Sequence, residues 1–416
     1  MRKKLYSMIL IMLSCFLIVL AGCGSSSQSD NGGKVSLNYM IWDKVQAVTY
    51  KKIAKDFEKK NPNIKINFTI VPFAQYWTKL QTSLTGNSGP DVFWMNIPNA
   101  YDYINGKQLA KLDLSEMGLK ASNYPNIEAF TSNQSVYGIP KDYDATALYY
   151  NKKLFDEAKV SYPDGSWTWQ DWENAAKKLT NKSKGIYGMA NPLSWQGGYY
   201  EVIYANGGTP FLKNGKSGFG QKATIDAMKF WYSFSEKGYA PSIKQMTDST
   251  QAESMLLSNK VAMMIDGSWI ASTLLTDKEN GKNIAVAPIP KGKVRASTTN
   301  SLANSINAKS AHIKEAQKWV AYVSSKEPME QIAKSGTAIP SYKGTQSAWT
   351  RPYQEDQHAE VFPKAVNYAV HLPGNKNAMK AINLETDEFK QVWNGKETIT
   401  QACKNLVKKA NQAMGY

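Results

Sequence analysis

The chain of 416 residues is too long to fold around one small hydrophobic core and indicates about two domains. Its 42% hydrophobic and 20% charged residues match the composition of an ordinary soluble protein. A formal net charge of +16 is compatible with a nucleic-acid partner, but the lysines are spread over expected helix faces such as 51–60, and no nucleic-acid fold motif is present. The charge is therefore assigned to a solvated surface, which also suits an anionic membrane or wall.

The first 22 residues have the plan of a secretory signal peptide. Three positive residues are followed by a mostly apolar stretch over 5–20 and then by Leu20-Ala21-Gly22-Cys23. This ending resembles a bacterial lipobox, and the resemblance implies cleavage before Cys23 and attachment of lipid, such as palmitate, to its sulfur. The alternative is a single transmembrane anchor, but the apolar run is marginal for a span of about 20 residues. Residues 23–34 are small and polar and are expected to form a flexible tether.

Strands and helices alternate after this tether. Apolar patterns predict strands at 35–42, 64–71 and 90–95, with helices at 49–60 and 76–84 between them. This order predicts a parallel α/β sheet, and ligands of such sheets bind beyond the carboxyl ends of the strands. The side chains expected at those ends are Trp42, Asp43, Trp94 and Asn96.

The segment 136–172 combines acidic and aromatic signals. A short apolar run is expected to stop at Pro140, which cannot donate to a central ladder, and a second run at 145–150 is long enough for one buried strand. Between these runs lie Asp142, Tyr143 and Asp144. Thr168 and Asp171 have the spacing of a helix capping box. The acidic insert predicts a place where the backbone crosses between structural units and meets a ligand.

Two later tryptophans also lie outside the expected core. Trp195 is in a loop before a helix. A buried strand at 261–265 ends at Asp266 and Gly267, and Trp269 opens the next helix. Gly267 is therefore expected to allow close backbone approach, with nearby amides facing a ligand.

Several of these segments resemble one family. The motifs, which include GPDVFW, LLSNKVAMM, DGSW and APIPKG, lie at 89–94, 137–172, 256–264, 266–269 and 287–292. Their types and order resemble the extracellular solute-binding proteins of ABC importers, the carbohydrate receptors that include maltose-binding protein. The resemblance implies a type II periplasmic-binding-protein-like fold, in which two discontinuous α/β lobes are joined by three crossovers with a ligand cleft between them.

The resemblance also implies domain boundaries. The expected divisions are 1–22 for the signal peptide, 23–34 for the tether, 35–142 with 300–338 for lobe 1, and 143–299 with 339–416 for lobe 2. The second crossover is expected within 298–307 and the third at 338–340. A strand is expected at 185–190, and a last helix at 399–414.

Site residues follow from the same resemblance. The residues on or beside the family's sugar-contacting positions are Trp94, Asn96, Asp144, Trp195 and Trp269. A second group of binding candidates, each with a structural alternative, is Trp42, Asp43, Asp142, Tyr143, Asp266, Gly267 and Asn300. Indole rings suit the apolar face of a sugar, although core packing is the alternative for each. No aromatic residue lies at 381–386, where maltose-binding protein has another stacking ring, which argues against maltodextrins.

The expected function is that of a receptor anchored by lipid to the extracellular face of the bacterial cytoplasmic membrane. As a monomer, it would capture a sugar or oligosaccharide and deliver it to an ABC importer permease by hinge closure. One alternative is a secreted glycosidase or lyase that uses acids such as Asp142 and Asp144. Another is a receptor for an anionic sugar held by Lys44 or Lys141. No catalytic motif, cofactor site or metal-ligand spacing is recognisable, and Cys403 is expected in the core.

Overall fold

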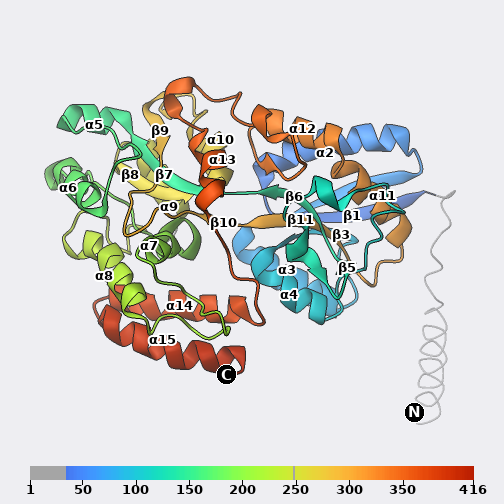
Figure 1. Ribbon diagram of the computed structural model, residues 1–416. Helices are drawn as coiled ribbons and strands as arrows, with labels where there is room; N and C mark the ends of the chain where they lie inside the picture. The colour runs from blue at the N-terminus through green and yellow to red at the C-terminus, as the bar shows by residue number, and fades with distance from the viewer. Residues whose placement is uncertain (1–33, 247–248) are drawn as a thin grey trace, which may run out of the picture.

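The computed structural model describes residues 34–246 and 249–416, so the predicted signal peptide, Cys23 and nearly all of the predicted tether lie outside the described residues. Two units lie side by side (Figure 1). The first unit, on the right of Figure 1, contains a six-stranded sheet in the order β12-β6-β11-β3-β1-β2. Its strands are β1 (Val35–Ile41), β2 (Ile64–Ile70), β3 (Val92–Asn96), β6 (Ile139–Tyr143), β11 (Ser301–Ile306) and β12 (Ile339–Pro340).

Helices cover this sheet. They are α2 (Lys44–Lys60), α3 (Phe73–Thr85), α4 (Ile97–Asn105), α11 (Ile313–Val323) and α12 (Lys326–Lys334). Helix α2 begins before the expected position 49 because Asp43 caps it. The Asp43 carboxylate accepts hydrogen bonds from the amides of Val45 (2.7 Å) and Gln46 (3.1 Å), two donors that have no partner within the helix.

The sheet of the first unit is mixed. Strand β1 runs parallel to β2 and β3, as the sequence predicts, but β11 runs antiparallel to β3 and β6. The predicted stop at Pro140 is wrong, because β6 continues through it. Leu302 pairs with Asp142 and Ala303 with Pro140, so Lys141 is an extra residue in β6 and the ladder is irregular there. Such a bulge accommodates a residue that has no amide hydrogen.

The second unit is built around β7 (Thr146–Asn151), which lies between β8 (Met263–Gly267) and β9 (Ile284–Ala287) and is antiparallel to both. The helices around it are α5 (Lys152–Ala158), α6 (Trp169–Leu179), α7 (Tyr200–Ala205), α8 (Lys222–Glu236), α9 (Ser249–Leu257), α10 (Ala271–Leu274), α13 (Val361–Ala365), α14 (Ala378–Trp393) and α15 (Ile399–Met414). The capping box of α6 is confirmed, since Thr168 and Asp171 exchange side-chain to backbone hydrogen bonds.

Short strands complete the described chain. They are β4 (Thr131–Ser132), β5 (Ser135–Val136), β10 (Thr298–Thr299) and β13 (Val370–His371). The strand predicted at 185–190 is wrong, because this segment forms only isolated bridges, from Ile186 to Asn181, from Tyr187 to Val261 and from Ala190 to Met264. The helix predicted at 399–414 is confirmed as α15, and Cys403 on its buried face is fully enclosed, as predicted.

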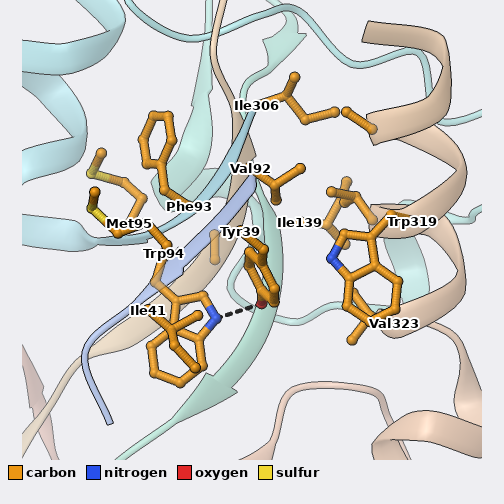
Figure 2. Packing of buried hydrophobic residues seen from close by; sticks show 14 of the residues in the cluster. Tyr39, Ile41, Val92, Phe93, Trp94, Met95, Ile139, Ile306, Trp319 and Val323 are labelled. Carbon is orange, nitrogen blue, oxygen red and sulfur yellow. Dashed lines mark hydrogen bonds between the residues drawn. The ribbon is translucent and has the colours of Figure 1, made fainter. Parts of the chain in front are cut away.

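Each unit has its own hydrophobic core. Figure 2 shows part of the first core, where Tyr39 lies between Trp94 and Trp319 and the Trp94 indole nitrogen donates to the Tyr39 hydroxyl at 2.5 Å. Burying one large side chain of this kind contributes about 1.5 to 3 kcal/mol. The second core surrounds α8 and includes Trp172, Trp231 and other fully buried rings. No helix within 34–246 or 249–416 is long and apolar enough to cross a membrane.

The chain passes between the two sheets at three places. Strand β6 is followed by Asp144 and Ala145 and then by β7. We call the segment 144–145 the first crossing. Strand β10 is followed by Asn300 and then by β11, the second crossing. Strand β12 marks the third. Ile339 pairs with Tyr143, so both belong to the six-stranded sheet and lie just past the predicted divisions at 142/143 and 338/339.

Candidate functional site

Asp144 occupies the first crossing and is bound to the second. Its side-chain atom Oδ1 accepts hydrogen bonds from the Asn300 amide and from Gln196 Nε2, both at 2.8 Å. The Asp144 amide donates in turn to the Asn300 carbonyl at 3.1 Å. Both side-chain bonds use one oxygen, so Oδ2 has no such bond within the described residues. Burial raises the pKa of Asp144 well above its ordinary value, although the Asn300 bond opposes the shift.

The loop before α7 reaches this acid. Trp195 is partly buried, with its ring 5.7 Å from that of Tyr200. Gly197 has a φ of +72°, a conformation that glycine adopts without strain. A β-carbon at Gly197 would lie 3.3 Å from the backbone and carboxylate of Asp266, so the loop lies directly on the end of β8. Gln196 and Gly197 thus join Asp144 to Asp266.

Trp269 lies just beyond the end of β8. A β-carbon added to Gly267 would come within 1.9 to 2.2 Å of three atoms of the six-membered ring of Trp269, so this ring lies against the Gly267 backbone. The sequence predicted close approach at Gly267 with nearby amides facing a ligand. Within the protein, the group that lies against the Gly267 backbone is the indole of Trp269. The Trp269 side chain is only partly buried. A ring supported in this way is a fixed platform for a flat apolar surface.

Asp266 is more enclosed than the sequence suggests. Its exposed fraction is 2%, its Oδ1 accepts from the Gly267 amide at 2.7 Å, and its Oδ2 is buried without a hydrogen-bond partner. Burial, with a further contribution from Glu253, raises the pKa of Asp266 well above its ordinary value. The carboxylate thus supports the turn beneath Trp269 rather than presenting a free oxygen at a surface.

The first unit contributes an aromatic cluster at the carboxyl end of β1. Trp42 is partly buried and makes edge contacts with Tyr76 (4.8 Å between ring centroids), Trp94 (5.0 Å) and Phe73 (5.6 Å). Phe73 is 47% exposed. Trp42 therefore covers Trp94, and Trp42 and Phe73 are the members of this cluster that a ligand can reach. The neighbouring Asp43 is engaged as the cap of α2.

Trp94 and Asn96, both predicted ligand contacts, are buried and have hydrogen-bond partners within the protein. Trp94 is fully buried, with its nitrogen bonded to Tyr39 and its ring 3.9 Å from the Lys141 ammonium. Asn96 is 2% exposed and caps α4, its oxygen accepting from the amide (3.3 Å) and side chain (2.8 Å) of Asn99. The sequence predicted both at the tip of strand β3 but did not show that Trp42 would pack against Trp94 or that Asn96 would cap α4.

Lys141 and Asp142 form a buried ion pair. The Lys141 ammonium also donates to Gln46 at 3.3 Å, while Asp142 Oδ1 is buried without a partner. Burial lowers the pKa of Lys141 and raises that of Asp142. Lys141 is thus committed to Asp142 and is not free to hold an anionic ligand. Tyr143 next to this pair is partly buried, and burial raises its pKa to about 12.

Asn300 ties the units together at the second crossing. It is 5% exposed, exchanges two hydrogen bonds with Asp144, and accepts from the Ile97 amide at 3.3 Å. The structure therefore brings together, directly or through one residue, Asp144, Trp195, Asp266, Gly267, Trp269 and Asn300. Sequence reasoning missed Gln196 and Glu201. Neither belongs to a motif, and only the folded loop places them beside Asp144 and the second crossing.

These features define a class before any comparison. Two α/β units, a chain that passes between them three times, and acids and supported indoles at the crossings are the architecture of a bilobal receptor. Residues within 34–246 and 249–416 contain no cluster of His, Cys, Asp and Glu able to hold a metal ion. Residues 43–330 match the family of bacterial extracellular solute-binding proteins, and the chain belongs to this family.

Similar proteins and structures agree with this assignment. The chain is 26% identical over 359 residues to a multiple sugar-binding protein of Streptococcus mutans, covering 81% of this chain and 82% of that protein. It is 30% identical over 300 residues to the maltodextrin-binding protein MdxE of Bacillus subtilis, covering 67% and 66%.

Among solved structures, an ABC substrate-binding protein of Listeria monocytogenes in complex with cycloalternan has a TM-score of 0.85 at 24% identity, covering 92% of this chain and all of that one. The maltose-bound MalE3 protein of T. maritima has a TM-score of 0.79 at 18% identity, covering 91% of this chain and 99% of that one. At these identities the likeness shows the fold, which is the predicted maltose-binding-protein-like, type II architecture.

Proposed function

We propose that this solute-binding protein captures a sugar or oligosaccharide beside Asp144, Trp195 and Trp269 and delivers it to the permease of an ABC importer. The observation that carries the proposal is the indole of Trp269, held against Gly267 and linked through Asp266, Gly197 and Gln196 to Asp144. A sugar presents pairs of hydroxyls and an apolar face, and this site offers a carboxylate and a supported ring. The names of the sugar-binding relatives support the same ligand class.

The two units suggest how capture proceeds. Hydroxyls bind carboxylates through charge-assisted hydrogen bonds, and indoles cover the apolar face. Trp42 and Phe73 come from the first unit, whereas Trp195 and Trp269 come from the second. A ligand that touches both sets would complete a buried interface and favour a closed arrangement of the units.

The proposed location is the extracellular face of the cytoplasmic membrane, with a lipid on Cys23. The lipobox-like sequence Leu20-Ala21-Gly22-Cys23 supports it, as do relatives described as lipoproteins in Streptomyces antibioticus and Streptococcus pneumoniae. One acyl chain holds a protein only marginally, so a diacyl anchor is the physically adequate form.

The enzyme alternative finds no support in the geometry of its two acids. Asp142 is bound to Lys141 and is not a free acid or nucleophile, and Asp144 keeps only Oδ2 without a hydrogen bond from Gln196 or Asn300. The bound sugar is therefore expected to be recovered intact. Chromatography after long incubation with the tightest ligand would test this, and cleavage that disappears in Asp142→Asn or Asp144→Asn would favour an enzyme.

A thermal-shift screen against an oligosaccharide panel tests the function itself. A ligand that binds only the folded state raises the melting temperature. Trp269→Ala and Asp144→Ala should then each be measured by calorimetric titration and by melting without ligand. Loss of a central stacking indole should cost a few kcal/mol of binding, and about 1.4 kcal/mol corresponds to a tenfold change.

Trp172→Ala is the matched control, because Trp172 is fully buried in the second core. It should lower the melting temperature and leave the affinity of the remaining folded protein unchanged. If Trp269→Ala and Asp144→Ala show this control pattern, both residues are structural and the proposed site is wrong.

A further inference from the structure

Glu201 is a fully buried acid on α7 that no sequence motif marks. Its Oε1 accepts hydrogen bonds from the Thr298 hydroxyl (2.6 Å) and the Gly197 amide (3.1 Å), and its Oε2 accepts from the Gly198 amide (2.8 Å). All three donors are neutral. Burying an acid is costly unless its oxygens are fully satisfied, so this arrangement indicates a specific role.

The two amides belong to the loop that carries Trp195 and Gln196. The backbone there leaves helical geometry at Gln196 (φ −91°, ψ 135°) and passes through the left-handed region at Gly197 (φ 72°, ψ 28°). This turn brings two consecutive amides to one carboxylate. Glu201 therefore fixes the loop conformation in which Gln196 reaches Asp144 and Gly197 lies on Asp266.

The third donor belongs to the second crossing. Thr298 begins β10, and its amide donates to the Thr146 hydroxyl at 3.0 Å. The next residue, Thr299, donates from its hydroxyl to the Asp144 carbonyl at 2.6 Å, and Asn300 donates to the Asp144 carboxylate. The segment 298–300 therefore donates hydrogen bonds both to Glu201 and to Asp144.

Together with the backbone between them, these hydrogen bonds form a closed ring of contacts. The path runs from Asp144 to Gln196, along the backbone to Gly197, to Glu201, to Thr298, along the backbone to Asn300, and back to Asp144. One side of the ring carries the partly buried Trp195 of the proposed site, and the other side is the strand along which the chain passes between the units. Networks of this kind carry coupling when their members move together.

We propose that Glu201 is a positioning residue that fastens the 195–198 loop to the second crossing, so that ligand contact with the loop and movement of the two units are coupled. The coupling of ligand contact to movement of the units rests on the proposed function, whereas the attachment of the loop to the second crossing does not. Burial raises the pKa of Glu201, although the bond from Thr298 and the two amide bonds oppose the shift, and this direction agrees with an acid enclosed away from solvent.

The experiment compares Glu201→Gln with Glu385→Gln. Glu385 is 1% exposed and accepts hydrogen bonds from Tyr199 (3.1 Å) and Tyr200 (3.0 Å), so it is equally buried and touches the same helix, but its bonds do not reach a crossing. Both variants should lower the melting temperature. Only Glu201→Gln should weaken binding of the tightest sugar, by about tenfold, and reduce the ligand-induced fall in the radius of gyration measured by X-ray scattering.

Two further variants address the crossing alone. Thr298→Val keeps both amide bonds of Glu201 and removes only the hydroxyl, whereas Thr298→Ser keeps the hydroxyl. Thr298→Val should reproduce the loss of affinity and compaction, and Thr298→Ser should not. Glu201→Gln and Thr298→Val variants that bind and compact as Glu385→Gln does would overturn the proposal.

Hydrogen exchange gives a readout without ligand. In Glu201→Gln, the amides of Gly197, Gly198 and Asn300 should lose protection together, while Glu385→Gln leaves all three protected. Loss at the two glycines alone would show that Glu201 holds only the loop, and the proposal fails. If no sugar binds the unaltered protein, the proposed function fails, and the exchange comparison still decides whether Glu201 joins the loop to the crossing.

Discussion

The six-membered ring of Trp269 lies against the backbone of Gly267, with three ring atoms within 1.9 to 2.2 Å of where a β-carbon would be. No residue with a side chain can occupy position 267 while the indole keeps this place. The glycine thus sets the orientation of the tryptophan, and β8 fixes the position of the glycine. The absence of a side chain at position 267 is therefore required for the Trp269 ring to take the orientation in which we propose it stacks on the sugar.

Gly267→Ala should therefore act like a loss of Trp269. The added methyl group would displace the indole, and we expect sugar affinity to fall by about tenfold or more, since a central aromatic contact is lost. Gly267 has an ordinary negative φ of −94°, so the substitution causes no backbone strain of its own. Calorimetric titration with the tightest sugar measures the effect.

Gly165→Ala provides the control for this substitution. A β-carbon at Gly165 would meet nothing within 4 Å, and its φ lies outside the left-handed region. Affinity and melting temperature should both stay at their original values. If Gly267→Ala retains full affinity, Trp269 either moves without consequence or does not contact the ligand.

Local signals in the sequence predicted much of the fold. The alternation at 35–42, the capping box of Thr168 and Asp171, and the apolar pattern of 399–414 each depend on neighbours within a few residues. These segments formed as predicted. The predicted end of the strand at Pro140 was wrong because a bulge in β6 accommodates this residue. A bulge depends on the register with β11, which no local pattern encodes.

The site was less predictable because its geometry depends on distant residues. Trp94 was expected at the tip of a strand but lies in the middle of β3. Trp42, which is distant in sequence, packs against its ring, and its indole nitrogen donates to the Tyr39 hydroxyl. Glu201 has no sequence signal, since its partners are two amides of a folded loop and a hydroxyl far along the chain. Gly267 was singled out from the sequence as a place of close approach to the backbone, but the packing of the Trp269 ring on it was not predicted.

Asp266 should make stability depend on pH. Burial raises its pKa in the folded state above the unfolded value of about 3.9, so between these two values the folded protein holds a proton that the unfolded chain releases. The corresponding stability is fully present below the unfolded pKa and is lost as pH rises through the folded pKa. Asp266→Asn removes this titration, so the fall in melting temperature between pH 4.5 and 7.5 should be smaller than in the unaltered protein.

The exposed Asp113 gives a control of opposite sign. Hydrogen bonds from the Ser115 side chain and from the Glu116 and Ser115 amides lower its pKa, so its contribution is present above the unfolded pKa and is lost as pH falls. Asp113→Asn should therefore not flatten the fall toward pH 7.5. An Asp266→Asn variant with the same pH profile as the unaltered protein would show that Asp266 is charged in both the folded and the unfolded state over this range, which would contradict the raised pKa.

The anchor prediction concerns Cys23, outside the described residues. We expect Cys23→Ala to be released from membranes or to accumulate unprocessed, because the sulfur that would carry lipid is absent. Detergent partitioning and mass spectrometry of the amino terminus measure both outcomes. Cys403→Ala is the control, because Cys403 is buried in the second core, where burial raises its thiol pKa to about 12. Unchanged mass and partitioning in Cys23→Ala would contradict lipidation.

Lys141 offers a test between a structural cation and an anion-binding one. Its ammonium is enclosed by Asp142, Gln46, Trp94 and Tyr50, and it is fully buried. Lys141→Met would leave the Asp142 carboxylate buried without a counter-charge, which typically costs about 3 to 5 kcal/mol of folding free energy. Urea unfolding of the unliganded protein measures this loss.

The double variant Lys141→Met with Asp142→Asn should regain most of the lost stability, because it removes the uncompensated charge as well. Recovery in the double variant identifies the ion pair as the origin of the effect. A lysine that serves to bind an anionic sugar would give another pattern: Lys141→Met would keep its unfolding midpoint and lose affinity for sugar phosphates or uronates, and Asp142→Asn would not compensate. That pattern would support the alternative in which Lys141 binds an anionic sugar, which the buried ion pair argues against.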